Sequence, residues 1–212
     1  MTILIIMMVL ICIGTLLFAI FKAKIKGTVG EWAVAAQAKR YLHDPAYMLM
    51  HDLTLPNGQG GTTQIDHVLL SPFGIFVIET KNYQGWIFAG AYHKHWTQQR
   101  YKKRYQFQNP LHQNYKHLKV LEGLLSDLAP ANVLHSIVVF MPAAEFKTPM
   151  PKQVFKGAAW TDYVKDFKQP VLRDLQLKRI QLCLEKHALP KSWATNRQHR
   201  QYVMNIQHEK SP

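Results

Sequence analysis

The stretch of sequence that decides the fold is QIDHVLLSPFGIFVIETK, residues 64–81. It covers most of one apolar segment, residues 62–70, and all of a second, residues 75–81. The β-branched and aromatic residues of both segments are typical of strands. The four residues between them, 71–74, are Ser-Pro-Phe-Gly. Ser, Pro and Gly occupy the first, second and fourth positions that a type I turn favours, so the pattern predicts a tight antiparallel hairpin.

The register of this hairpin decides where two carboxylates lie. If the four-residue turn closes the hairpin, Asp66 falls directly opposite Glu79. Lys81 comes two residues after Glu79 and therefore lies on the same side of the sheet. A three-residue loop with a bulge at Gly74 would instead shift the pairing by one residue and put the carboxylates on opposite faces.

Two facing carboxylates indicate a cation site. Negative charges inside an apolar hairpin repel each other and are costly to desolvate, whereas a bound divalent cation reverses that interaction. Mg²⁺ commonly binds one or two carboxylates and keeps waters that leave room for a phosphate oxygen. The Lys81 ammonium could then stabilise charge on the phosphate or orient the attacking water, which suits metal-assisted phosphodiester hydrolysis. The same residues equally fit a structural arrangement, in which Asp66 ends the hairpin and Glu79 forms an exposed pair with Lys81.

The remaining periodicity predicts a mixed α/β sheet flanked by helices, within a domain of residues 27–189. Asn109 and Pro110 suit the N-cap and first position of a helix. The chain from Pro190 to residue 212 is polar and basic, and is expected to be a frayed tail. The predicted helices cover residues 27–42, 110–126 and 172–187, and the predicted strands cover residues 46–55, 62–70, 75–81, 85–89, part of 92–107, and 133–141.

These motifs resemble a known group of nucleases. Asp66 followed by Glu79-Thr80-Lys81 resembles the Asp…Glu-x-Lys core of the PD-(D/E)XK nuclease superfamily, and the fuller pattern over about residues 27–140 is similar to the nuclease-related domain (NERD) family. The motifs that carry this wider similarity are Gly27-Thr28-Val29-Gly30-Glu31, Gln64-Ile65-Asp66-His67, Gly74-Ile75-Phe76-Val77-Ile78-Glu79-Thr80-Lys81, Gly85, Asn109-Pro110, Gln113 and His117.

The resemblance implies a restriction-endonuclease-like αβββαβ core with a site for Mg²⁺ or Mn²⁺. Asp66 and Glu79 would be the metal ligands, and the Thr80 carbonyl would add another. Lys81 would be the catalytic lysine. Ile65 stands where the superfamily usually has Pro before the aspartate.

Two further residues receive roles from the resemblance. Gln113 would position the lysine or the nucleophilic water, and Glu31 would act as an accessory acid. Each also has a simpler explanation. Gln113 suits the polar face of a surface helix, and Glu31 lies near a helix N-terminus, where a carboxylate interacts favourably with the macrodipole.

The composition favours polyanionic partners. The 212 residues include 26 Lys and Arg against 13 Asp and Glu, a formal net charge of +13. Such a balance favours nucleic acid or an anionic membrane surface as partner. The two cysteines exclude a disulfide framework and a Cys-based zinc site.

Residues 91–120 form what we call the basic aromatic belt, which has cations and aromatic rings but neither Asp nor Glu. Cations bind phosphates and aromatic faces stack on unpaired bases, so the belt predicts nucleic-acid binding with little sequence specificity. Ordinary strand aromatics with solvated charges, or attraction to anionic lipid, are the alternatives. The predicted nucleic-acid-binding residues are Lys94, Arg100, Lys102, Lys103, Arg104, Lys116 and Lys119, and the interleaved rings are Tyr92, Trp96, Tyr101, Tyr105, Phe107 and Tyr115.

The first 21 residues are expected to form a single transmembrane anchor. They contain no charged side chain, and as a helix residues 2–21 would span about 30 Å, the thickness of a bilayer core. A cleaved signal peptide would need a basic start and a small-residue cleavage site, which this run lacks. Residues 22–26 form a basic linker containing three lysines, which by the positive-inside rule places the body in the cytoplasm and Met1 outside.

Three functions remain open on the sequence. The first is a membrane-anchored, metal-dependent nuclease acting on DNA in preference to RNA, which the combination of Asp66, Glu79 and Lys81 favours. The second is a catalytically silent nuclease-like module that binds nucleic acid or a protein. The third is a membrane assembly protein whose basic body contacts lipid.

Overall fold

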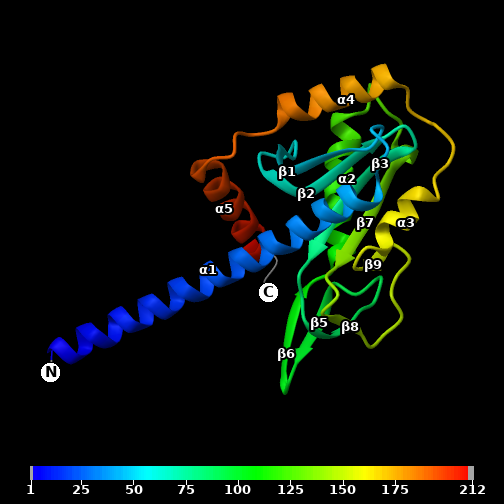
Figure 1. Cartoon of the computed structure of the whole chain (residues 1–212). Helices are drawn as coiled ribbons and strands as arrows, with labels where there is room; N and C mark the ends of the chain where they lie inside the picture. Colours follow the sequence, from blue (N-terminus) through cyan, green and yellow to red (C-terminus); the bar gives the residue numbers. More distant parts are fainter. Residues whose placement is uncertain (1, 210–212) are drawn as a thin grey trace.

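The computed structural model describes residues 2–209, and the side chains near both ends of that range are described only in part (Figure 1). The elements in chain order are α1 (Thr2–Tyr41), β1 (Met48–Pro56), β2 (Thr62–Ser71), β3 (Gly74–Lys81), β4 (Gly85–Phe88), β5 (His95–Arg100), β6 (Lys103–Gln108), α2 (Pro110–Leu124), a 3₁₀ turn (Ala131–Val133), β7 (Leu134–Phe140), β8 (Ala144–Phe146), β9 (Val154–Lys156), α3 (Ala159–Lys165), α4 (Asp174–His187) and α5 (Trp193–Glu209).

A five-stranded mixed sheet in the order β1-β2-β3-β7-β9 forms the centre of the fold. β1, β2 and β3 are antiparallel neighbours, and β7 joins β3 in parallel through the crossover that contains α2. Alternate residues of the β2–β3 hairpin enter different core layers. Val68 and Val77 pack with α2 and α4, whereas Leu69 and Phe76 pack with the C-terminal part of α1 and with α3. The predicted mixed α/β sheet flanked by helices is confirmed.

The hairpin has the predicted register. Ser71 pairs with Gly74 and His67 with Ile78, so a two-residue loop closes it without a bulge. The Ser71 hydroxyl donates to the Gly74 carbonyl (3.1 Å) and accepts from the Phe73 amide (3.2 Å). Gly74 has φ +151°, and an added Cβ would lie 2.8 Å from the His135 ring, so only glycine fits this corner.

A second, four-stranded sheet in the order β6-β5-β4-β8 lies beside the first and extends away from it (Figure 1). Its base shares a core cluster with β7, in which Trp96 stacks on Phe140 with ring centroids 6.0 Å apart. The predicted strands in residues 85–107 are therefore confirmed, although they build a separate sheet.

The first helix runs without a break from Thr2 to Tyr41, through residues 22–26. The predicted helix end near Tyr41 is confirmed, and the N-terminal part of α1 stands away from the rest of the molecule (Figure 1). Most side chains of residues 1–21, the predicted anchor, lie outside the described residues. Among the residues that were described, none of the helices combines the length and the apolar character needed to cross a membrane.

The frayed tail expected from Pro190 is instead the helix α5, which packs against β2. His199 Nδ1 lies 2.9 Å from the Thr62 hydroxyl, and the Tyr202 hydroxyl accepts from the Asn57 amide at 2.6 Å. The Tyr202 ring covers Gly61, where an added Cβ would lie 2.1 Å from a ring carbon. Polar contacts and close packing on Gly61 attach this helix, and its residues are mostly polar, so the sequence alone indicated a tail.

Candidate active site

The candidate site forms where β2 and β3 separate. Their ladder ends at the pair of His67 and Ile78, one position before Asp66 and Glu79. Beyond that point β3 continues along β7, with Glu79 beside Val138. Asp66 does not pair through its backbone with β3 but turns its carboxylate to the Thr80 amide, which donates to Oδ2 at 2.7 Å.

A twist in the β1–β2 ribbon coincides with this separation. Met50 and Leu53 enter the same core layer although they are three positions apart in the chain, and the same holds for Ile65 and Val68. A regular strand would place such residues on opposite faces. Asp52, opposite Asp66 in the register, has φ +50°, which marks the point at which the ribbon turns.

Glu79 is the central acidic group, with 2% of its side chain exposed. The Lys81 ammonium pairs directly with Oε1, as expected for two residues on one side of a strand. His117 Nε2 lies 3.3 Å from Oε2, and its Nδ1 lies 2.7 Å from the Thr63 hydroxyl. Both carboxylate oxygens therefore have partners.

Gln113 lies on α2 in contact with the lysine. Lys81 Nζ donates to the Gln113 side-chain oxygen at 3.0 Å. Two features fix α2 at this distance. The Asn109 side chain caps the helix by accepting from the Leu111 amide, and the buried Asn114 donates to the carbonyls of Val77 (2.9 Å) and Ile137 (3.2 Å) on the two central strands.

The electrostatics distinguish the two carboxylates. Burial alone would raise the pKa of Glu79, but the charge of Lys81 and the hydrogen bond from His117 hold it below its ordinary value. Burial likewise opposes the charge of Lys81, while Glu79 raises the lysine pKa above its ordinary value. The pair is therefore ionised.

Asp66 is in the opposite situation. Burial, and then the charge of Glu79, raise its pKa well above the ordinary value, and the Thr80 hydrogen bond and Lys81 compensate only in part. A carboxylate under such repulsion is where an added cation would be stabilising.

Glu31 reaches the same region from α1. Burial raises its pKa, and so do the charges of Asp52 and Glu79. Gly30 allows this approach, because a Cβ at that position would lie only 3.1 Å from the side chains of Thr80 and Asn82.

The donor set suits a hard divalent cation in its chemistry. Asp66 and Glu79 supply carboxylate oxygens, which Mg²⁺ and Mn²⁺ prefer. Burial, and then the charge of Glu79, disfavour the ionised form of Asp66, which a cation would stabilise. In the described part of the chain, no three His, Cys, Asp or Glu side chains are grouped so as to hold a metal ion. The residues thus fit the group as two protein ligands completed by other oxygens.

The structure divides the basic aromatic belt. Arg100, Lys102, Lys103 and Arg104 gather at the tip of the β5–β6 hairpin, where Tyr101 is 87% exposed. Lys116 and Lys119 lie on α2, and Lys119 pairs with Glu122 at 2.6 Å. Lys94 lies in the turn before β5. The rings of Trp96 and Phe107 belong to the core and are not available to stack on bases.

Sequence reasoning gave no role to two residues beside the site, His117 and Asp52, although His117 is among the residues that carry the family resemblance. His117 is one helical turn after Gln113 and so faces the same way, which was a usable signal. Asp52 accepts from Gln64 (2.7 Å) and lies 3.5 Å from Lys191. Its neighbourhood depends on the pairing of β1 with β2, so no local pattern points to it.

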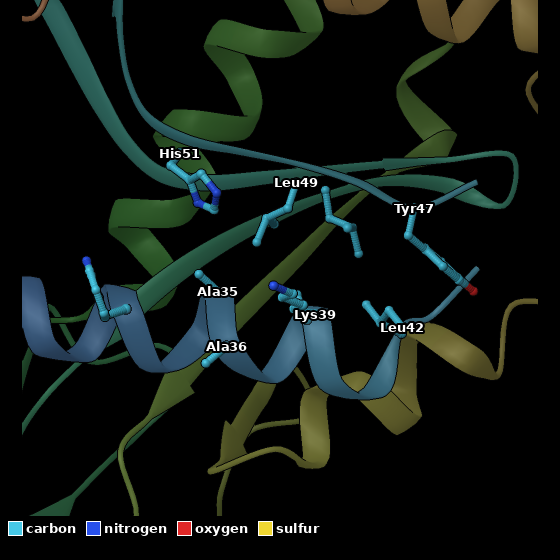
Figure 2. Close-up of a pocket in the computed structure, with 10 residues that line it drawn as sticks. Ala35, Ala36, Lys39, Leu42, Tyr47, Leu49 and His51 are labelled. Atoms are coloured by element: carbon cyan, nitrogen blue, oxygen red, sulfur yellow. The ribbon is translucent and has the colours of Figure 1, made fainter. Parts of the chain in front are cut away.

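A hollow of about 450 Å³ lies between α1 and β1, outside the acidic site. Figure 2 shows Leu49 and His51 of β1 directed toward Ala35 and Lys39 of α1. Its lining is mostly apolar, so it does not extend the charged site.

Glu79, Thr80 and Lys81 at the end of β3 thus lie beside Asp66 of β2 in a mixed α/β sheet. Residues 26–141, more than half of the chain, match the nuclease-related domain, NERD, and the chain belongs to this family. It is 40% identical over 124 residues to an uncharacterized protein of Bacillus anthracis, and the match covers 58% of this chain and 57% of that protein. The chain therefore spans little more than half the length of this relative. No solved structure matches it significantly.

Proposed function

We propose that this chain is a membrane-anchored, divalent-metal-dependent nuclease that hydrolyses phosphodiester bonds of DNA with little sequence specificity. One observation carries the proposal. The Lys81 ammonium contacts both Glu79 and Gln113 beside the repelled carboxylate of Asp66, in a chain of the NERD family.

Each residue has a role in this proposal. Asp66 and Glu79, with the Thr80 carbonyl, would hold Mg²⁺ or Mn²⁺, which when bound would polarise the phosphate and lower the pKa of a bound water. Lys81, oriented by Gln113, would stabilise the charge that develops on the phosphate. Its raised pKa supports this role, because the ammonium stays protonated at neutral pH.

The same geometry supports an accessory acid and a positioning residue. Glu31 would serve as an accessory acid, and its raised pKa favours holding a proton beside the acidic pair. His117 holds Glu79 in place from α2 and is in turn held by Thr63, so we assign it as a positioning residue.

The belt cations would bind the nucleic-acid backbone. Those at the β5–β6 tip are exposed and well separated from carboxylates in the hairpin sequence, which suits sequence-independent phosphate contacts. The net charge of +13 supports the same partner.

The anchor is part of the proposal. The uncharged run of residues 1–21 followed by Lys22, Lys24 and Lys26 supports a single span, with Met1 outside and the body in the cytoplasm. The projecting N-terminal part of α1 is compatible with that arrangement (Figure 1).

A catalytically silent binding module is the second candidate. Its support is the full engagement of Glu79 by Lys81 and His117, which leaves the ligand set smaller than a complete metal centre. In that case the acidic pair would be a remnant within a nucleic-acid-binding fold.

Cleavage of plasmid and single-stranded DNA by the purified chain, with Mg²⁺, Mn²⁺ or EDTA, tests the proposal. We expect metal-dependent cutting that Asp66→Asn and Lys81→Ala each reduce by at least about 100-fold, as for loss of one electrostatic group at a reaction centre. Matched controls are Asp162→Asn and Lys165→Ala, which alter an exposed ion pair on α3 and should cut like wild type.

Folding of each variant is checked by its thermal unfolding midpoint. Binding of DNA without cutting, unchanged in the Asp66 and Lys81 variants, would contradict the nuclease and support the silent module.

A further inference from the structure

A groove of about 640 Å³ lies beside the active site, between α2, the β1–β2 turn and α5. Two residues of its lining belong to the site. Gln113 accepts a hydrogen bond from Lys81, and His117 contacts Glu79. The groove therefore borders the side chains that would act on a phosphodiester.

The lining has a distinctive chemistry. Asn and Gln side chains, such as Gln59, Gln64 and Gln108, form much of it, together with the rings of Tyr115 and Tyr202. Lys116 and Lys119 supply positive charge, and none of the lining residues that the structure describes carries a carboxylate. The groove thus combines hydrogen-bonding amides, aromatic faces and cations.

We propose that this groove binds a single-stranded segment of nucleic acid next to the bond to be cut, and that α5 supplies one wall of the site. Unpaired bases expose both their faces and their edges, which suit aromatic rings and amide groups, while lysines suit the phosphates between them. A duplex hides the faces of its bases, so the aromatic rings could not stack on them, although amides and lysines could still contact its phosphates and groove edges. The choice of substrate rests on the proposed nuclease function.

The wall that α5 supplies belongs to the C-terminal part of the chain. It lies after residue 141, where the family match ends. Asn57, which receives Gln59 and Gly61 amides on its side-chain oxygen at 2.9 Å each, organises the β1–β2 turn and also holds the Tyr202 hydroxyl. The turn and the helix are therefore fixed to each other across the end of the groove.

Binding of a fluorescein-labelled oligothymidylate by the full chain in mild detergent tests this inference, with EDTA present so that no cutting occurs. We expect Tyr115→Ala and Tyr202→Ala each to weaken binding about fivefold or more, as for loss of one stacking ring. Tyr202→Phe keeps the ring but loses the hydrogen bond with Asn57, so it should bind more tightly than Tyr202→Ala. Tyr41→Ala, which removes a partly exposed ring at the end of α1, is the matched control and should stay within about twofold of wild type.

Three outcomes separate the possibilities. Loss in both alanine variants, with a matched duplex competing poorly, supports the groove. Unchanged affinity in Tyr115→Ala and Tyr202→Ala, or equal competition by the duplex, overturns it. Because cutting is measured separately with metal, a groove-dependent binder that never cuts would overturn the nuclease alone, and a nuclease with unaffected variants would overturn the groove alone.

Discussion

The buried histidine next to Asp66 lies in an environment that disfavours its charged form. His67 is 1% exposed, its Nδ1 lies 3.0 Å from Nδ1 of His51, and its Nε2 has no hydrogen-bond partner among the described residues. Burial, followed by His51, lowers the pKa of His67 to about 4. The folded protein therefore holds this ring neutral.

This shift predicts an acid-sensitive fold. Between about pH 6.5 and pH 4 the unfolded chain binds a proton at His67 that the folded chain does not, so stability falls as the pH falls. The expected loss from this group between pH 7.5 and pH 5 is about 2 kcal/mol. Urea unfolding at both pH values should show that His67→Leu loses about that much less than wild type over this interval. An equal loss in both proteins would contradict the assignment.

Local motifs predicted part of the site and missed the rest for a physical reason. Asp66, Glu79 and Lys81 lie within one hairpin, so their proximity follows from a turn and a period of two. Gln113 was reached only through resemblance, because its contact with Lys81 depends on how α2 packs. Asp52 lies opposite Asp66 only because β1 pairs with β2, which no nearby sequence reveals.

Among the elements, α2 connects the sheet to the site. It carries Gln113 and His117, and a single buried amide, Asn114, fastens it to the carbonyls of Val77 and Ile137 and to the Ser136 hydroxyl. The side-chain nitrogen of Asn114 therefore bonds to both β3 and β7, next to the residues that begin the site.

Asn114→Ala should both destabilise the fold and disturb the site. Leaving buried carbonyls without their donor costs about 2–3 kcal/mol, which urea unfolding measures. If α2 also shifts, cutting should fall further than the loss of folded protein explains. Asn132→Ala, an exposed position, should change stability by less than about 0.5 kcal/mol. An Asn114 variant as stable as wild type would mean that the amide does not fasten the helix.

Helices and strands could be predicted where the local sequence carries clear signals, and were missed where the element depends on contacts with distant residues. The 62–81 hairpin and the capped α2 follow from turn and cap residues. The basic aromatic belt was interpreted as one surface, yet Trp96 and Phe107 pair at the base of the β5–β6 hairpin and enter the core. Tyr105 lies on the same face, two residues nearer the tip, and is half exposed. α5 depends on contacts with Asn57 and Thr62, which lie far away in the sequence.

At the scale of the whole molecule, the proposed anchor has a direct test. In membranes from cells that express the full chain, we expect it to resist an alkaline carbonate wash. Leu10→Lys and Ile13→Lys would each oppose insertion by about 2.5–3.5 kcal/mol, so the double variant should be released into the wash. Leu10→Ile and Ile13→Leu together are the matched control. Release of the unaltered chain would contradict the anchor.

The unbroken α1 has a geometric consequence for such an arrangement. Glu31 comes ten positions after Phe21, so the acidic site would lie about 15 Å along the helix axis from the end of the span. An uninterrupted helix also fixes the direction in which the site faces around the helix axis, because each residue turns the chain by about 100°. Inserting two residues between Phe21 and Glu31 would turn the acidic site to nearly the opposite side of the helix axis. Inserting seven would restore its direction and move it about 10 Å farther from the membrane. The distance of the site from the membrane and its direction around the axis of α1 could then be changed separately.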